Sequence, residues 1–211
     1  NDMSACVIIP ARYKSTRFPG KPLALIAGKE MILHVCEKAE QAVGKSHVYV
    51  ATEDRRIAEV VNSAGYNFVI TSDTCLTGTD RVAEASKELD YDIYVNLQGD
   101  EPLVNPEDIK AAIQMKKENF NTVVNCVTKI NDIEEMKSKS VPKMVYDDNN
   151  NLLYASRSSI PGSKEGVILG HKQVCIYCFN SKELELFADN SKSPNEKVED
   201  IEILRLLDKG V

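Results

Sequence analysis

The sequence predicts an α/β fold, in which a mostly parallel β-sheet is covered by helices and carries a smaller β-rich lobe. Over about the first 120 residues, short apolar segments alternate with segments whose apolar residues recur at helical spacing. This alternation is typical of parallel strands with helices on both faces of the sheet. Beyond that point, apolar segments follow one another with little helix between them, which indicates a β-rich part.

The first part begins with the apolar run Cys6–Pro10, which predicts a strand buried on both faces and followed at once by a loop. The patterns that follow predict helices at 31–43, 54–64, 80–89 and 106–118, and strands at 46–51, 68–70 and 93–97. Pro106 suits a first helical turn, and Asn105 before it is the candidate N-cap.

The second part contains predicted strands at 122–130, 143–146, 152–154 and 173–179, with a hairpin turn at 147–151. Helical patterns at 181–188 and 196–208 close the sequence. We therefore expect a single domain over residues 1–211, in which a β-rich lobe at about 121–180 is inserted between a first part at about 1–120 and closing helices at 181–211.

Composition excludes several classes of protein. With 211 residues and 43% hydrophobic residues, the chain can bury a sizeable core. Its 26 Lys and Arg stand against 32 Asp and Glu, so it lacks a general basic field for nucleic acid. Apolar runs such as Ala5–Pro10 are too short to span a bilayer, and the first residues show no signal segment. We expect a cytoplasmic protein without nucleic-acid or membrane partners.

The cysteines do not indicate a metal site. Four of the six, Cys6, Cys36, Cys75 and Cys126, stand singly in apolar contexts, which favours buried reduced thiols. Cys175 and Cys178 have a spacing seen in metal sites, but in a strand positions three apart point to opposite faces. The histidines, His34, His47 and His171, form no ligand-spaced cluster.

The densest chemical signal is the basic loop, residues 11–23, which follows the first predicted strand in the segment IPARYKSTRFPGKPL at 9–23. Ligands of open α/β sheets bind at this edge of the sheet. A polyphosphate needs cations, hydroxyl donors and small residues that let backbone N–H groups approach. The candidates are Arg12, Ser15, Arg17 and Lys21. A solvated basic loop is the alternative for any single one of them, and the pattern matches neither a P-loop nor a dinucleotide fingerprint.

Two further segments carry polar residues where strand and helix patterns begin or end. Asp100 follows the buried strand of VNLQGDEPL at 95–103, where a carboxylate could hold Mg²⁺ beside a triphosphate or could simply belong to a surface turn. In TGTDR at 77–81, Thr79 or Asp80 could cap a helix. Arg81 lies early in that helix, where a cation opposes the dipole, so we expect it to meet an anion or a nucleobase edge.

These segments, in this order, resemble the 3-deoxy-manno-octulosonate (Kdo) cytidylyltransferases, which make CMP-Kdo. The resemblance extends over almost the whole chain and includes ATEDRRIAEV at 51–60, TGTDRVAEA at 77–85, YASRSSIP at 154–161, CIYCF at 175–179 and EDIEILRLL at 199–207. It implies a nucleotidyltransferase-type, Rossmann-like sheet with a nucleotide-binding first part and an acceptor-binding and dimerisation lobe.

The resemblance also implies roles for individual residues. Nucleotide binding falls to Pro10, Ala11, Arg12, Ser15, Lys21, Thr79, Arg81 and Gln98, and acceptor binding falls to Gln98, Arg157, Gln173, Tyr177 and Glu202. Arg12, Lys21 and Asp100 would be catalytic, with Asp100 as the Mg²⁺ ligand. The acceptor's anomeric hydroxyl would attack the α-phosphate of CTP in line and expel pyrophosphate. The partners expected are thus CTP and a small acidic sugar, in a homodimer.

Departures from the family pattern cluster in the acceptor region. Gln173 replaces a family histidine, and Ile203 replaces the usual glutamine. Gly162 occupies the position after Ile-Pro at which the family often has a tryptophan. A Kdo-like acid such as an amino-substituted octulosonate, or a small phosphonate or carboxylate, is therefore an alternative acceptor. The sequence also stops at Val211, before a further family aspartate, so we expect a missing C-terminal segment or an incomplete metal site. A catalytically weak CTP-binding regulatory protein is the alternative from another class.

Overall fold

The computed structural model describes residues 2–15 and 17–211, which form two compact units. The first unit contains the described residues up to Val124 together with Cys175–Asp189. The second unit contains Asn125–Val174 and Asn190–Val211. Of the helices in the described residues, none is long and apolar enough to cross a membrane.

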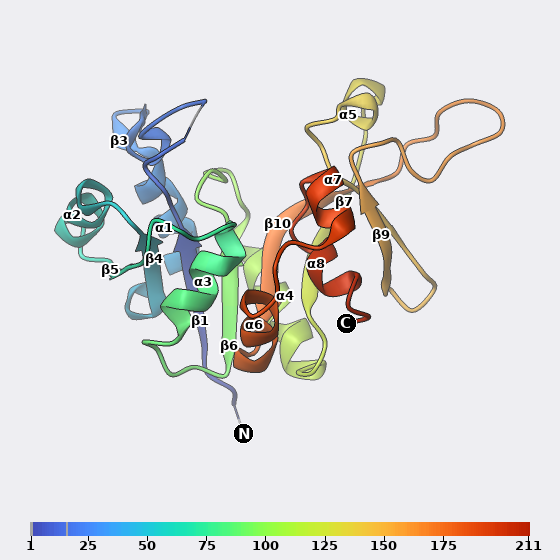
Figure 1. Cartoon of the computed structure of the whole chain (residues 1–211). Coiled ribbons are helices and arrows are strands. Elements are labelled where there is room, and N and C mark those ends of the chain that lie inside the picture. Colours follow the sequence, from blue (N-terminus) through green and yellow to red (C-terminus); the bar gives the residue numbers. More distant parts are fainter. Residues whose placement is uncertain (1, 16) are drawn as a thin grey trace. The chain divides into compact units, whose positions relative to one another are not determined.

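The first unit is built on a mainly parallel sheet, as the sequence predicts. Its strands are β1 (Ala5–Pro10), β4 (Val48–Thr52), β5 (Asn67–Ile70), β6 (Ile93–Leu97) and the Cys175–Phe179 part of β10 (His171–Phe179). They lie in the order β5-β4-β1-β6-β10, in which β10 alone runs antiparallel to its neighbour (Figure 1). Central β1 pairs with β4 and β6, so that Val7 lies opposite both Val48 and Val95.

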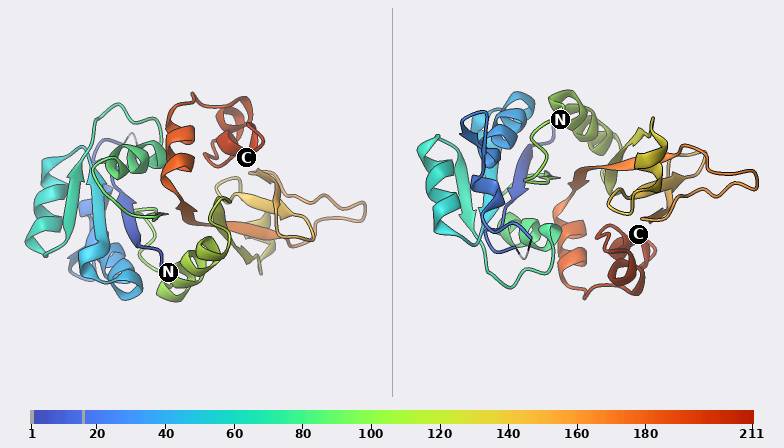
Figure 2. Two further views of the ribbon diagram at one scale, coloured as in Figure 1. Left: turned by 90° about the horizontal axis from the view of Figure 1, so that it is seen from below. Right: turned by 90° about the horizontal axis from the view of Figure 1, so that it is seen from above.

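Helices cover both faces of this sheet. They are α1 (Met31–Val43), α2 (Arg55–Ser63), α3 (Gly78–Ser86), α4 (Pro106–Glu118) and α6 (Ser181–Ala188). Two 3-10 turns, η1 (Lys21–Leu23) and η2 (Lys45–His47), and a small hairpin, β2 (Leu25–Ile26) and β3 (Lys29–Glu30), complete the unit. Helices α1 and α4 pack together on one face, and α3 and α6 pack together on the other (Figure 2). The core between these layers includes the fully buried Ile8, Val35, Val95 and Ile109.

Local capping chemistry fixes where several helices begin. The Asn105 side chain accepts a hydrogen bond from the Glu107 N–H at 2.9 Å, and Pro106 occupies the first turn of α4, which confirms the prediction. Asp54 caps α2 by accepting from the Arg56 N–H at 2.8 Å. Each cap satisfies a backbone donor that the helix itself leaves without a partner, and such caps contribute about 1 kcal/mol.

Two of the four cysteines predicted to be buried, Cys6 and Cys36, are buried, and the other two, Cys75 and Cys126, are not fully buried. Cys6, Cys36 and Cys178 are buried, whereas Cys75, Cys126 and Cys175 are half-buried. Burial raises the pKa of the Cys6 thiol and raises the pKa of Cys36 to about 12, which keeps both protonated at neutral pH.

The second unit is the β-rich part. It contains β7 (Val124–Lys129, from Asn125 on), β8 (Lys143–Tyr146), β9 (Leu152–Ser156), the first residues of β10, and the helices α5 (Ile133–Lys137), α7 (Pro194–Glu199) and α8 (Leu204–Leu207). Strand β8 pairs antiparallel with β9 and with β10, and β7 also pairs with β10. The predicted turn joins β8 to β9: the Asp147 carboxylate accepts the N–H groups of Asn149 and Asn151, at 2.8 and 2.9 Å.

The prediction of one helix over residues 196–208 was wrong. Helix α7 ends at Glu199, and Asp200 adopts a left-handed conformation with φ 55° before α8 begins at Leu204. The carbonyls of Glu199 and Asp200 accept hydrogen bonds from the Arg157 guanidinium. The arginine thus provides partners for carbonyls that the end of α7 leaves without helical donors. Helix α6 belongs to the first unit, whereas α7 and α8 belong to the second.

Candidate active site

The basic loop leaves the carboxyl end of β1 in the first unit. The Ala11 N–H donates to the Ala51 carbonyl at 2.9 Å, so β1 stays attached to β4 up to the start of the loop. Arg12 is exposed, and the Ser15 hydroxyl accepts from the Phe18 N–H at 3.4 Å. Thr16 lies outside the described residues. A cationic, accessible segment at this edge of the sheet fits a ligand-binding loop.

Lys21 and Asp100 lie together. The Lys21 Nζ is 3.6 Å from the Asp100 carboxylate, and the two side chains are 45% and 55% exposed. An ion pair this exposed contributes little to stability. Its significance is its position, because it joins the predicted phosphate-binding lysine to the predicted metal-binding carboxylate at adjacent strand ends.

Two glycines allow the three motifs to approach one another. A Cβ on Gly99 would lie 2.8 Å from the Pro10 carbonyl oxygen, so only glycine fits between β1 and the turn after β6. A Cβ on Gly78 would lie 3.3 Å from the Gln98 amide and 3.4 Å from the Pro10 ring. The ends of β1 and β6 and the first turn of α3 therefore converge, as expected if they form one site.

Replacing Gly99 with alanine should separate these strand ends. The added methyl group meets a backbone oxygen, which cannot move aside cheaply, and overpacking of this kind costs about 1–3 kcal/mol. Denaturant unfolding should register this loss. Gly162→Ala is the matched control, since nothing lies within 4 Å of its Cβ position. Equal stability of the two variants would show that the close approach at Gly99 imposes no constraint.

The first turn of α3 is capped by Thr77, so the capping role predicted for Thr79 or Asp80 was wrong. The Thr77 hydroxyl accepts from the Asp80 N–H at 3.2 Å and donates to the Asp80 carboxylate at 2.8 Å. Thr79 instead points into the interior, where its hydroxyl accepts from the Asn96 side-chain amide at 2.9 Å. Thr77 precedes the helix in extended conformation, which is the geometry an N-cap requires.

Arg81 is buried, and protein acceptors compensate for its charge. Its Nη1 donates to the Thr71 hydroxyl at 2.6 Å and to the Ser72 carbonyl at 2.9 Å. These acceptors explain how a cation is tolerated in the first turns of a helix. Contact between Arg81 and a ligand stays a prediction.

Asn96 is a polar residue that sequence reasoning missed. Its side chain is fully buried in β6, and its Oδ1 is the one buried side-chain oxygen without a hydrogen-bond partner among the described residues. A single amide within the apolar strand IYVNL was the available signal. Because Asn96 holds Thr79, it connects β6 to the first turn of α3, next to Gln98.

The predicted acceptor residues are divided between the units. Tyr177 belongs to the first unit, where it is buried, lies opposite Asn96 in the strand register and stacks on Phe179 at 6.1 Å between ring centroids. Gln173 and Glu202 belong to the second unit. The Gln173 amide donates to the Asn125 side chain at 2.8 Å, and the Glu202 carbonyl accepts from the Arg205 N–H at 3.0 Å.

Arg157, also in the second unit, holds backbone carbonyls. Its guanidinium donates to the carbonyls of Glu199 and Asp200 and, at 3.0 Å, to that of Lys139. In return, the Glu199 carboxylate accepts the Arg157 backbone N–H at 2.9 Å. These contacts give the side chain a structural role between β9 and the end of α7.

Arg157→Ala should therefore destabilise the second unit by about 1–3 kcal/mol, because three carbonyls lose a charged donor. Urea unfolding should show a lower midpoint. Lys164→Ala, in the exposed loop before β10, is the control. An Arg157→Ala midpoint equal to that of wild type would contradict this structural role.

The fold and the converging motifs define a nucleotidyltransferase of the α/β class. A family model described as cytidylyltransferase matches residues 6–211. A 3-deoxy-manno-octulosonate cytidylyltransferase of Geobacter metallireducens is 40% identical, with coverage of 99% of this chain and 87% of the relative. An 8-amino-3,8-dideoxy-manno-octulosonate cytidylyltransferase of Shewanella pealeana is 39% identical, with the same coverage. A solved CMP:2-keto-3-deoxy-manno-octonic acid synthetase complexed with CTP superposes with a TM-score of 0.91, at 37% identity, over 99% of this chain and 87% of that one.

The chain belongs to the cytidylyltransferase family, and within it to the CMP-Kdo synthetases. The resemblance inferred from its motifs is thereby confirmed, together with the mainly parallel α/β fold and the nucleotidyltransferase class of enzyme.

Enzymes of this family generally use a divalent metal ion, and the donor set here is compatible with one. Asp100 supplies one accessible carboxylate beside Lys21. A hard cation such as Mg²⁺ commonly takes one or two carboxylates and completes its coordination with phosphate oxygens and water. Among the described residues, no group of three or more His, Cys, Asp or Glu side chains is placed to hold a metal ion.

Proposed function

We propose that this chain transfers the cytidylyl group of CTP to Kdo, or to a closely related octulosonate such as its 8-amino derivative, and releases pyrophosphate. The observation that carries the proposal is the convergence of the basic loop, the β6–Asp100 turn and the α3 first turn at one sheet edge. The names of the relatives support CTP as the nucleotide and an octulosonate as the acceptor.

In this mechanism the acceptor's anomeric oxygen forms a bond to the α-phosphorus of CTP. The bond from that phosphorus to the bridging oxygen of the β-phosphate breaks in line, pyrophosphate leaves, and the hydroxyl proton passes to solvent. Arg12, Ser15 and Lys21 bind the phosphates and neutralise their charge. Pro10, Ala11, Arg81 and Gln98 line the nucleotide, which fixes the α-phosphorus in the geometry for attack. Thr79, the other residue expected to bind the nucleotide, is buried and would support the first turn of α3 from the interior through its bond to Asn96.

Asp100 would hold Mg²⁺, which when bound adds positive charge against the triphosphate. The Lys21 Nζ lies 3.6 Å from this same carboxylate. The lysine and the ion would therefore lie side by side and would both contact the triphosphate. Lys21 and Asp100 follow adjacent strands of the first unit, so this unit supplies a cation and a metal-binding carboxylate to the triphosphate.

Gln98, Tyr177, Arg157, Gln173 and Glu202 are the proposed acceptor residues, and Gln98 is the one that lies among the converging motifs. The three carbonyls use three of the five N–H groups of the Arg157 guanidinium, so its remaining N–H groups could bind the acceptor carboxylate. The homodimer expected from the resemblance stays a prediction.

The test is pyrophosphate release with Mg²⁺ across two panels. Each of CTP, UTP, ATP and GTP is paired with Kdo, and CTP is then paired with Kdo, 8-amino-Kdo, a sialic acid and a small phosphonate. We expect release with CTP and an octulosonate. Preference for another nucleotide, or release only with the phosphonate, would contradict the proposal. CTP binding without release would favour a regulatory role.

A further inference from the structure

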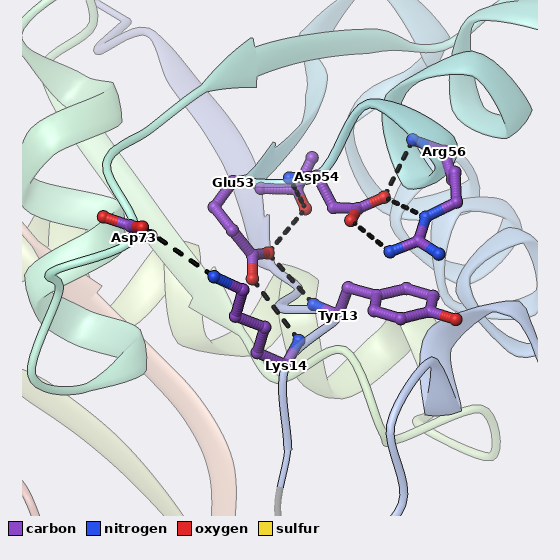
Figure 3. A network of polar contacts seen from close by, with 7 residues as sticks. Tyr13, Lys14, Glu53, Asp54, Arg56 and Asp73 are labelled. Carbon is purple, nitrogen blue, oxygen red and sulfur yellow. Dashed lines mark hydrogen bonds and ion pairs between the residues drawn. The ribbon is translucent and has the colours of Figure 1, made fainter.

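The Glu53 side chain binds the backbone of the basic loop. This residue follows β4, and its carboxylate accepts hydrogen bonds from two consecutive N–H groups of the loop (Figure 3). The Tyr13 N–H donates to Oε1 at 3.0 Å, and the Lys14 N–H donates to Oε2 at 3.4 Å. A single half-buried side chain therefore ties the loop after β1 to the end of the neighbouring strand.

The Tyr13 side chain provides a second attachment. The Arg56 guanidinium lies 3.4 Å from the centroid of the Tyr13 ring, which is a close cation–π contact. Asp54 orients this guanidinium through bonds of 3.0 Å to Nε and 2.8 Å to Nη2, and the hydrogen bond from Arg56 lowers the pKa of the Asp54 carboxyl (Figure 3). Both groups therefore stay charged at neutral pH.

Tyr13 also connects this anchor to Lys21. The Gly20 N–H donates to the Tyr13 carbonyl at 2.8 Å, and a Cβ on Gly20 would lie 2.8 Å from the Tyr13 ring. Gly20 has φ 72° and directly precedes Lys21. The conformation that presents Lys21 thus depends on where Tyr13 is held.

The charge on Lys14 does not explain the Glu53 contact. The Lys14 Nζ lies 3.9 Å from the Asp73 carboxylate, in a pair whose side chains are 79% and 63% exposed (Figure 3). Glu53 acts on the loop's main chain instead. Two consecutive backbone N–H groups facing one carboxylate form the kind of cradle that binds phosphate in other loops.

We propose that Glu53 is a positioning residue for CTP: it occupies the N–H groups of Tyr13 and Lys14, so the triphosphate is bound by Arg12, Ser15 and Lys21, which the anchored loop presents. This inference rests on the proposed use of CTP. The Glu53 carboxylate would then fix the geometry of the loop without itself contacting phosphate or acceptor.

Glu53→Gln tests the proposal, because it keeps the side-chain size and places an amide donor against one of the two N–H groups. We expect the CTP Kd and the KM for CTP to rise about tenfold, as for loss of a charge-assisted hydrogen bond, while the acceptor KM is unchanged. Hydrogen exchange of the Tyr13 and Lys14 amides should become faster. The melting temperature shows whether the variant folds.

Asp92→Asn is the matched control. Its carboxylate also accepts a backbone N–H, that of Ser4 at 2.9 Å, next to the opposite end of β1. Unchanged CTP affinity in Glu53→Gln, or an equal loss in Asp92→Asn, would overturn the proposal. A wild-type protein that binds CTP without releasing pyrophosphate would refute the proposed function alone, since CTP affinity and amide exchange still test Glu53.

Discussion

Lys21→Ala is expected to lower the turnover of pyrophosphate release by about 100-fold or more, a loss typical when a group that stabilises transition-state charge is removed. Negative charge moves onto the leaving pyrophosphate as the bond to the α-phosphorus breaks. Lys21 is suited to meet that charge, because it lies in the loop after β1 with its Nζ 3.6 Å from Asp100. Steady-state kinetics at saturating CTP measures the effect.

Lys29→Ala is the control for Lys21→Ala. Lys29 also forms an ion pair, 2.6 Å from Glu37, with side chains 36% and 45% exposed, but it lies in the β2–β3 hairpin. We expect its turnover to match wild type. A Lys21→Ala variant that keeps near-normal turnover would remove Lys21 from the mechanism.

Asp100→Asn is the second variant with a large expected effect, again a loss of turnover of about 100-fold. The asparagine keeps the size of the side chain but removes the charge that would bind Mg²⁺ and that now pairs with Lys21. A readout independent of turnover is the dependence of CTP binding on Mg²⁺. In wild type the ion should tighten CTP binding, and in Asp100→Asn most of that gain should disappear.

The control for Asp100→Asn is Asp90→Asn, which removes an exposed carboxylate that precedes β6 instead of following it. We expect it to retain both turnover and the effect of Mg²⁺. If Mg²⁺ strengthens CTP binding equally in Asp100→Asn and wild type, the metal is held elsewhere.

Local sequence signals predicted the elements whose limits are set locally. The helix at 106–118 was predicted with its observed bounds, because Asn105 and Pro106 carry the start signal themselves. The break between α7 and α8 could not be read this way. There Asp200 is left-handed, and its carbonyl is bound by Arg157, which lies 43 positions away along the chain.

The same distinction applies to the candidate site. Lys21 and Asp100 belong to motifs that each follow a strand of the parallel sheet, and such positions meet at one edge of the sheet. In the structure the two side chains form an ion pair. Glu53 and Asn96 were missed because their roles are contacts with segments far away in the sequence: Glu53 with Tyr13, and Asn96 with Thr79. Asn96 stands out in the sequence as the one amide of an apolar strand, but only the folded chain reveals the partner of either residue.

The most direct test of the central claim follows the α-phosphorus of CTP. The wild-type protein is incubated with Mg²⁺, Kdo and CTP labelled with ³²P at the α position, and the products are separated. We expect the label to appear in a conjugate of the acceptor, with one pyrophosphate released for each conjugate formed. Label found only in CTP or free CMP, while pyrophosphate is released without the acceptor, would contradict cytidylyl transfer.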